Sequence, residues 1–160
     1  IRNVANREMH MSTLGKCLGI ACALAFMTSS VGMAAGEKTD VYGTWLTKGG
    51  KSKVAIEPCG KEVCGRIVWL REPLDDAGKP KLDGKNRREG LRDRPLIGLP
   101  LLTGFVPGKK QGTYEDGDIY NPEDGKTYSS EMALLEDGTL KVEGCVLIFC
   151  KEQIWTPVED

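Results

Sequence analysis

The chain has six cysteines, of which Cys17 and Cys22 lie in the predicted signal peptide described below. The four that remain are the residues whose chemistry is easiest to anticipate. Cys59 and Cys64 are separated by four residues, and so are Cys145 and Cys150. An even number of cysteines in an oxidising compartment favours disulfides, and four cysteines allow three connectivities. The short spacing favours the two local pairs, each closing a tight loop between two strands. A four-cysteine zinc site is the alternative, although such sites usually place only two residues between neighbouring cysteines.

Carboxylates are the next candidates for chemistry, because the predicted domain contains no histidine. The only histidine, His10, lies upstream of it, which removes Ser-His-Asp and Cys-His systems and most catalytic zinc sites. Glu131, Glu143 and Glu152 fall in three consecutive predicted strands, and a glutamate pair inside a barrel can share a proton. The alternating phase turns Glu143 away from the apolar face, and all three can instead point to solvent. We assign no catalytic residue, and an enzyme is the least favoured function.

Acidic loops raise the question of a calcium site, since calcium prefers oxygen ligands. The residues concerned form two groups, Asp116, Asp118, Asn121, Glu123 and Asp124 in one and Asp75, Asp76 and Asp83 in the other. Neither group has the spacing of an EF-hand loop, and aspartate is common in turns for backbone reasons. The chain also lacks a P-loop and a G-x-G-x-x-G motif after a strand. No metal site and no cofactor are predicted.

Residues 16–35 have the features of a secretory signal peptide. Lys16 provides the positive start, Leu18–Met27 is an apolar run, and small residues follow. The run is too short to span a bilayer, which takes about twenty apolar residues. A buried core helix is the alternative, and a lipoprotein anchor on Cys22 would cut the run short. We expect 1–35 to be an upstream extension and signal, and the protein to be periplasmic or secreted, without stable membrane insertion after signal removal.

Residues 36–160 are long enough for one domain with one hydrophobic core. The chain has a net charge of −1 and no block of basic residues, so neither nucleic acid nor an anionic membrane is indicated as a partner. Short segments with a period of two alternate with Gly-containing turns, which is typical of half-buried strands joined by hairpins. Strands are expected at 41–47, 52–57, 64–71, 98–105, 112–121, 126–135, 139–147 and 150–157.

Eight antiparallel strands in sequential order favour an all-β, up-and-down closed barrel, and a two-sheet sandwich is the alternative. Residues 72–97 do not fit this pattern, because they are polar, charged and rich in Pro and Gly. A loop of this length is usually functional or has structure of its own, and 86–93 can form one or two helical turns. The apolar segment 95–107 is interrupted by Pro100, which suits an edge or a bulge better than a regular central strand.

The chain resembles a secreted bacterial family, domain of unknown function 2147, in four segments that occur in the family's order. They are KVAIEPCGKEVCGRIVWL (53–70), RPLIGLPLLTGF (94–105), GDIYNPEDGKTYSSEMALLEDGTLKVEGCV (117–146) and QIWTPV (153–158). The resemblance implies a lipocalin-like β-barrel that is exported to the periplasm or beyond, and it implies no reaction.

A second resemblance concerns the start of the predicted barrel. Gly43-Thr44-Trp45 is similar to the G-x-W motif of lipocalins, in which the Trp plugs the closed end of the barrel. Lipocalins also carry a basic residue on the last strand that packs across this Trp, and Lys151 is the only basic residue available there.

A barrel of eight strands is either filled by its side chains or holds one small ligand. Apolar and aromatic residues are expected to supply the strand interiors, namely Tyr42, Trp45, Ile56, Val68, Trp69, Tyr120, Tyr128, Met132, Leu134, Ile154 and Trp155. We predict that a ligand contacts six of the interior residues and two arginines of the long loop, namely Trp45, Trp69, Tyr120, Tyr128, Met132, Trp155, Arg92 and Arg94. Together with Arg87 and Arg88, the loop arginines can meet an anionic head group, or they can simply be solvated beside Glu89 and Asp93.

Three functions follow from these features. The first is an exported lipocalin-like protein that binds a small apolar or amphipathic molecule, such as a fatty acid or another lipid-like compound. The second is an interaction module with a filled barrel, whose loops bind an envelope protein that the sequence does not identify. The third is an enzyme based on carboxylates. A cavity of roughly 300 Å³ or more distinguishes the first from the second.

Overall fold

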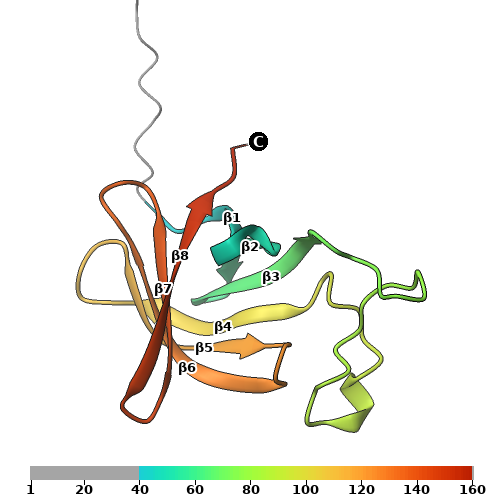
Figure 1. Ribbon diagram of the computed structural model, residues 1–160. Coiled ribbons are helices and arrows are strands. Elements are labelled where there is room, and N and C mark those ends of the chain that lie inside the picture. Colours follow the sequence, from blue (N-terminus) through green and yellow to red (C-terminus); the bar gives the residue numbers. More distant parts are fainter. Residues whose placement is uncertain (1–39, 160) are drawn as a thin grey trace, which may run out of the picture. The chain divides into compact units, whose positions relative to one another are not determined.

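Eight antiparallel strands close into one barrel in the computed structural model, which describes residues 40–159 (Figure 1). The strands are β1 (Gly43–Leu46), β2 (Ser52–Cys59), β3 (Glu62–Leu70), β4 (Pro100–Pro107), β5 (Thr113–Asn121), β6 (Lys126–Leu134), β7 (Leu140–Val146) and β8 (Phe149–Pro157). They pair in chain order, and β1 closes the barrel against β8 through the Trp45–Pro157 pair. The up-and-down barrel is confirmed, and the sandwich is wrong. The predicted signal peptide lies outside the described residues.

Glycine turns and alternating strands explain why this order could be predicted. Gly125 lies between β5 and β6 with a φ of 69°, and Gly138 lies between β6 and β7 with a φ of 77°. Glycine adopts such left-handed angles without steric penalty, so the Asp-Gly pairs mark true hairpins. Within a strand, successive side chains point to opposite faces, and in β7 the alternate residues Leu140 and Val142 are buried in the barrel.

The barrel is filled with apolar side chains at the end where β1 begins. Residues buried in this part of the core include Val41, Trp45, Ile56, Val63, Phe105, Tyr114, Met132 and Leu140. The indole Nε1 of Trp45 donates a hydrogen bond of 2.8 Å to the carbonyl oxygen of Val41. A Cβ on Gly117 would lie 2.3 Å from Cγ of Phe105, so the ring of Phe105 occupies the space that only a glycine leaves free.

A bulge in the β2–β3 pairing overturns the expected positions of two residues. The register passes from the Lys53–Trp69 pair to the Val54–Ile67 pair, which inserts one extra residue, Val68, into β3 and changes the phase of the strand. Val68 and Trp69 are consequently 39% and 40% exposed. The ring of Trp69 lies on the outer surface, where the Nζ of Lys53 is 5.4 Å from its centroid. The expectation that both side chains face the interior is wrong.

Two other residues expected in the interior also lie outside. Ile154 and Trp155 are consecutive in β8 and must point to opposite faces. Trp155 is buried, and Ile154 is 38% exposed. Tyr42 precedes β1 and is 36% exposed. The error arose from counting neighbouring apolar residues as interior without assigning each to one face.

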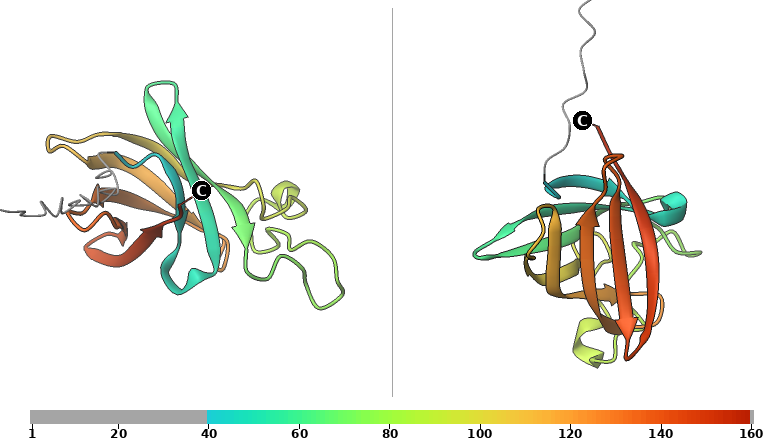
Figure 2. Two further views of the ribbon diagram at one scale, coloured as in Figure 1. Left: turned by 90° about the horizontal axis from the view of Figure 1, so that it is seen from above. Right: turned by 90° about the vertical axis from the view of Figure 1, so that its left-hand side faces the viewer.

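The segment 72–97 projects from one side of the barrel, as the views in Figure 2 show. It contains the short 3₁₀ helix η2 (Glu89–Leu91), which falls within the stretch expected to form a helical turn. Strand β4 then begins at Pro100 and pairs with both β3 and β5, with register shifts opposite β3. It is thus irregular as expected, but it is not an edge strand. Within residues 40–159, no helix has the length and apolar character needed to cross a bilayer.

Candidate functional site

A cavity of about 920 Å³ opens at the end of the barrel opposite the filled core. Its deepest lining residues are Ile67, Leu101 and Trp155, with exposures of 2%, 7% and 1%. The other lining residues are Thr47, Lys48, Lys51, Ser52, Leu70, Arg71, Glu72, Lys81, Leu96, Ile119, Tyr120, Asn121, Pro122, Glu123, Asp124, Tyr128, Gly144, Lys151 and Gln153. The volume exceeds the roughly 300 Å³ that a small-molecule site requires, so the barrel is not filled throughout.

The rim of the cavity is charged, with more basic than acidic residues. The basic residues are Lys48, Lys51, Arg71, Lys81 and Lys151, and the acidic residues are Glu72, Glu123 and Asp124. Lys81 pairs with Glu72 at 3.2 Å, whereas the guanidinium of Arg71 donates to the carbonyl oxygen of Gly49 at 2.9 Å. Arg71 and Lys151 form no ion pair with any carboxylate in the part of the chain that the structure describes. The charge of Lys151 nevertheless contributes to the lowered pKa of Glu123.

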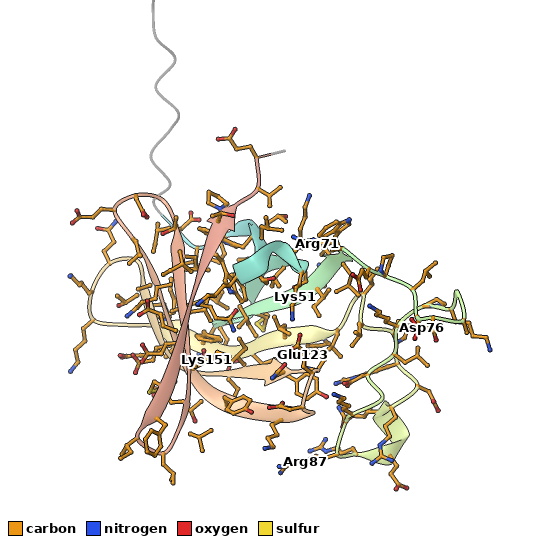
Figure 3. The ribbon with its side chains drawn as sticks, in the orientation of Figure 1. Lys51, Arg71, Asp76, Arg87, Glu123 and Lys151 are labelled. Carbon is orange, nitrogen blue, oxygen red and sulfur yellow. A yellow bond between two sulfur atoms is a disulfide. The ribbon has the colours of Figure 1, made fainter. Side chains whose placement is uncertain are left out.

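One ion pair spans the mouth of the cavity. Lys51 precedes β2, and Glu123 lies in the turn between β5 and β6. These two connections lie on opposite sides of an eight-stranded barrel that closes in chain order. The Nζ of Lys51 nevertheless lies 2.7 Å from an Oε of Glu123, and we call this contact the Lys51–Glu123 bridge. The hydrogen bond and charge of Lys51 lower the pKa of Glu123, and the same contact raises the pKa of Lys51. Figure 3 shows both residues at the mouth, with Lys151 facing them from β8.

A buried carboxylate fixes the segment 72–97 beside the mouth. Asp83 is fully buried and accepts hydrogen bonds from the hydroxyl of Tyr120 at 2.6 Å, the amide of Asn86 at 2.8 Å and the guanidinium of Arg94 at 2.9 Å and 3.0 Å. Burial, followed by the hydrogen bond to Asp83, raises the pKa of Tyr120. Since buried charges are stable only when paired and hydrogen-bonded, this network holds the long segment in one position against β5.

A second contact holds the same segment against the turn between β5 and β6. Gly125 has a φ of 69°, and a Cβ at this position would lie 1.8 Å from the carbonyl oxygen of Lys85. No side chain can be accommodated between these two backbones. The Asp-Gly pair that predicted a hairpin therefore has a second role, because its glycine also lets the long segment approach the barrel.

Three of the residues predicted to contact a ligand line the cavity, namely Tyr120, Tyr128 and Trp155. Trp45 and Met132 lie in the filled core and do not line the cavity. The exposed Trp69 lies on the outer face of β3. Thus the predicted set combines residues of the cavity, the core and the outer surface.

The two arginines predicted to meet a head group are engaged by the long segment itself. Arg94 binds Asp83, and its guanidinium lies 5.6 Å from the ring centroid of Tyr120. The Nε of Arg92 donates to the carbonyl oxygen of Asn86 at 2.8 Å. Neither side chain lines the cavity.

The sequence reasoning missed the polar residues of β8 that face the cavity. Lys151, Gln153 and Trp155 alternate along this strand and all line the cavity. The period of two, extended backwards from Trp155, would have placed the other two on the same face. Lys151 does not take the position expected from the lipocalin motif. Trp45 pairs with Pro157, about 20 Å along β8 from Lys151 at the usual rise of a strand.

Both predicted disulfides are present, and they lie at opposite ends of the barrel. Cys59 bonds to Cys64 at the β2–β3 hairpin, and Cys145 bonds to Cys150 at the β7–β8 hairpin. The local pairing is confirmed, and a four-cysteine zinc site is excluded because the thiols are consumed. Among residues 40–159, the one group of three potential metal ligands joins Glu143 to the second disulfide, so it offers no free thiolate either.

The three glutamates considered for acid–base chemistry form a row on the outside of the barrel. Glu131 pairs with Glu143, and Glu143 pairs with Glu152. Their neighbours Met132 and Val142 are buried on the opposite face. The outward direction predicted for Glu143 is confirmed, and the hypothesis of a glutamate pair inside the barrel is wrong.

In a comparison with known proteins, residues 43–157 match the family described as "Uncharacterized protein conserved in bacteria (DUF2147)". Among solved structures, the chain is similar to protein HP1028 from the human pathogen Helicobacter pylori, which is described as belonging to the lipocalin family. The two share 24% identity with a TM-score of 0.66, over 77% of this chain and 86% of that chain. No curated protein matches. At this identity, the likeness shows the fold.

Proposed function

Because the chain belongs to the DUF2147 family and folds as a lipocalin-like barrel, we propose that it is an exported protein that binds one small amphipathic molecule, such as a fatty acid. The observation that carries the proposal is the cavity of about 920 Å³, which has an apolar floor and a charged rim. Ligand sites of this size are commonly lined by apolar side chains with a few polar groups that orient the ligand.

The distribution of side chains in the cavity supports an amphipathic ligand with an anionic head. An acyl chain would contact Ile67, Leu101 and Trp155, with the rings of Tyr120 and Tyr128 along its upper part. Burying apolar surface in this way is the main favourable contribution to binding. A carboxylate would lie at the rim beside Lys151 and Arg71, which form no ion pair with a carboxylate of the described chain.

Export is supported by the two disulfides. Structural disulfides persist in oxidising compartments such as the periplasm and are rare in the cytosol. The predicted signal peptide at 16–35 would deliver the chain there, and 36–160 would be the mature domain. The ligand would then be a compound of the cell envelope or its surroundings.

The test is a titration of the disulfide-bonded protein with palmitate, followed by amide NMR and native mass spectrometry. We expect saturable binding with one palmitate per chain and shifts at residues of the cavity. Gln153→Phe places a ring in the cavity from a partly exposed position and should weaken binding by about tenfold or more, since 1.4 kcal/mol suffices for that factor. Glu152→Phe, on the outer face of the same strand, is the matched control and should bind as the unaltered protein does.

The head-group position is tested by a neutral analogue. Lys151→Gln should weaken the binding of palmitate while leaving the binding of hexadecanol unchanged, because only the carboxylate loses a charged partner. Equal binding of palmitate to the Gln153→Phe and Glu152→Phe variants would remove the cavity from consideration. If neither palmitate nor hexadecanol binds, the result would favour the alternative of an interaction module that binds a protein partner through its loops.

A further inference from the structure

The β7–β8 hairpin ends in four consecutive large apolar residues that are surrounded by solvent. Val146, Leu147, Ile148 and Phe149, which we call the apolar tip, are 51%, 93%, 86% and 75% exposed. The other exposed large hydrophobic residues among 40–159 reach at most 51%. Leu147 also has a φ of 55°, a left-handed conformation that is unfavourable for a bulky side chain. An exposed apolar cluster on this scale indicates a contact with another molecule.

The β2–β3 hairpin shows that the fold does not require an apolar tip. Each of the two hairpins has a two-residue turn and a disulfide with the same spacing. The turn of the first is Gly60–Lys61, in which Gly60 takes the left-handed conformation with a φ of 74°. The turn of the second is Leu147–Ile148. Because a glycine occupies the left-handed turn position at one end of the barrel, the turn itself does not account for the leucine at the other end.

Three basic residues border the same groove as the apolar tip. Arg87, Arg88 and Lys126 line a groove together with Val146 of the tip. None of the three forms an ion pair with another residue of the described chain. The β7–β8 tip and part of the segment 72–97 both reach the lower edge of Figure 1, the tip at the left and the segment at the right, and both reach the lower edge of the right-hand view in Figure 2. Folding thus creates a basic region that no run of the sequence contains.

We propose that the apolar tip docks on the surface of an anionic phospholipid bilayer. In this arrangement the four apolar side chains enter the boundary between head groups and acyl chains, and Arg87, Arg88 and Lys126 contact lipid phosphates. Binding at a membrane interface increases with buried apolar area and with attraction to anionic lipids. The disulfide between Cys145 and Cys150 keeps the two strands paired behind the tip.

A bilayer fits the tip better than a protein partner does. A stable protein interface usually buries about 1,200 Å² or more between two complementary surfaces, whereas the tip is a projection that ends in a two-residue turn. A bilayer requires no shape complementarity. A second copy docked symmetrically through this end would bring Arg87, Arg88 and Lys126 close to their equivalents, and like charges in apposition oppose association.

The apolar tip is joined directly to strand residues that line the cavity. Gly144 and Lys151, which flank the Cys145–Cys150 disulfide in sequence, line the cavity. The groove beside the tip also shares Tyr120 and Tyr128 with the cavity. Docking through the tip would therefore hold the cavity mouth at the lipid surface. The docking does not depend on which compound the cavity binds, so each proposal can fail separately.

The experiment is co-sedimentation of the disulfide-bonded protein with vesicles of phosphatidylethanolamine and phosphatidylglycerol, and in parallel with vesicles of phosphatidylcholine alone. We expect the protein to sediment with the anionic vesicles and much less with the neutral ones. The double variant Leu147→Ser, Ile148→Ser should weaken binding by about tenfold or more, since a buried leucine alone contributes that much. Arg87→Gln with Arg88→Gln should weaken binding to anionic vesicles and reduce its dependence on salt.

The matched control is Leu74→Ser, which removes an apolar side chain that is 51% exposed elsewhere on the surface and should leave sedimentation unchanged. Retained palmitate binding by the double serine variant separates a docking defect from damage to the cavity. The proposal is overturned if the double serine variant sediments as the unaltered protein does. It is equally overturned if the protein sediments with neither kind of vesicle, and a dimer that the serine substitutions abolish would then assign the tip to self-association.

Discussion

The two ends of the barrel are built from the same eight strands, yet one is filled and the other is hollow. At the end where β1 begins, Phe105, Tyr114 and Met132 are buried in one continuous apolar core. At the mouth, the strands end around a cavity whose rim is charged. Exposed ion pairs such as those at the rim contribute little to stability. We therefore expect side chains of the filled end to contribute more to stability than the charged side chains of the rim do.

Two inward-facing glycines let large side chains pack against the strands at both ends of the barrel. The space beside Gly117 is occupied by Phe105, whose Cγ would lie 2.3 Å from an added Cβ. The nearest atom to a Cβ on Gly144 would be Cγ2 of Ile119 at 3.1 Å, and Gly144 lines the cavity. Both glycines therefore let a neighbouring side chain pack closely, the ring of Phe105 at the filled end and Ile119 beside the cavity.

The largest effect is expected from truncating the core at the filled end. Phe105→Ala should lower the free energy of unfolding by about 3–5 kcal/mol, because it removes a buried ring and leaves a void. Leu96→Ala at the mouth should lower it by no more than about 2 kcal/mol, since that side chain already borders open space. Urea denaturation monitored by circular dichroism measures both losses. Equal losses would mean that the hollow end contributes as much stability as the filled one.

The barrel could be predicted because its determinants are local in the sequence. Alternation in β7 and the glycine turns at Gly125 and Gly138 fix strands and hairpins over a few residues. The faces of Val68 and Trp69 could not be predicted, because a bulge shifts the phase of β3 and its position depends on pairing with β2. Sequence periodicity assigns a face only as long as the register is regular.

The mouth was harder to predict because its contacts join distant parts of the chain. Lys51 and Glu123 are 72 residues apart, and nothing near either residue indicates the other. Asp83 was considered as a calcium ligand in an acidic loop, but folding surrounds it with Tyr120 and Arg94. Among the polar residues of the mouth, only those of β8 could have been predicted, because Lys151 and Gln153 alternate with a period of two back from Trp155.

An effect of intermediate size is expected where the long segment is fixed beside the mouth. Asp83→Asn keeps the shape of the side chain but removes the charge that holds Arg94, and a lost charged hydrogen bond costs about 1–3 kcal/mol. We expect the loss to be local, so amide hydrogen exchange should accelerate in 72–97 and remain slow in the barrel strands. Asp76→Asn, at an exposed position of the same segment (Figure 3), is the control. Faster exchange throughout the barrel would show that the mouth and the core unfold together.

The smallest effect is expected at the Lys51–Glu123 bridge. Both side chains are largely exposed, at 72% and 68%, so Lys51→Met should leave the midpoint of thermal unfolding unchanged within experimental error. Because the bridge spans the mouth, its loss should accelerate the release of bound palmitate, by at most about fivefold for so exposed a pair. Lys61→Met, at the opposite hairpin, is the control.

The dependence of release on pH tests the bridge without any substitution when the ligand is hexadecanol, which has no carboxylate to titrate. Lys51 lowers the pKa of Glu123 through a hydrogen bond and its charge, so the bridge is intact above the ordinary pKa of glutamate and is lost as pH falls through the lowered value. The raised pKa of Lys51 preserves the bridge at high pH until that value is passed. Between about pH 5 and pH 9, inside the ordinary values of roughly 4.3 and 10.4, the release rate should be constant, and it should rise on further acidification. If the release rate already changes within this interval, titratable groups other than Lys51 and Glu123 control the release of the ligand.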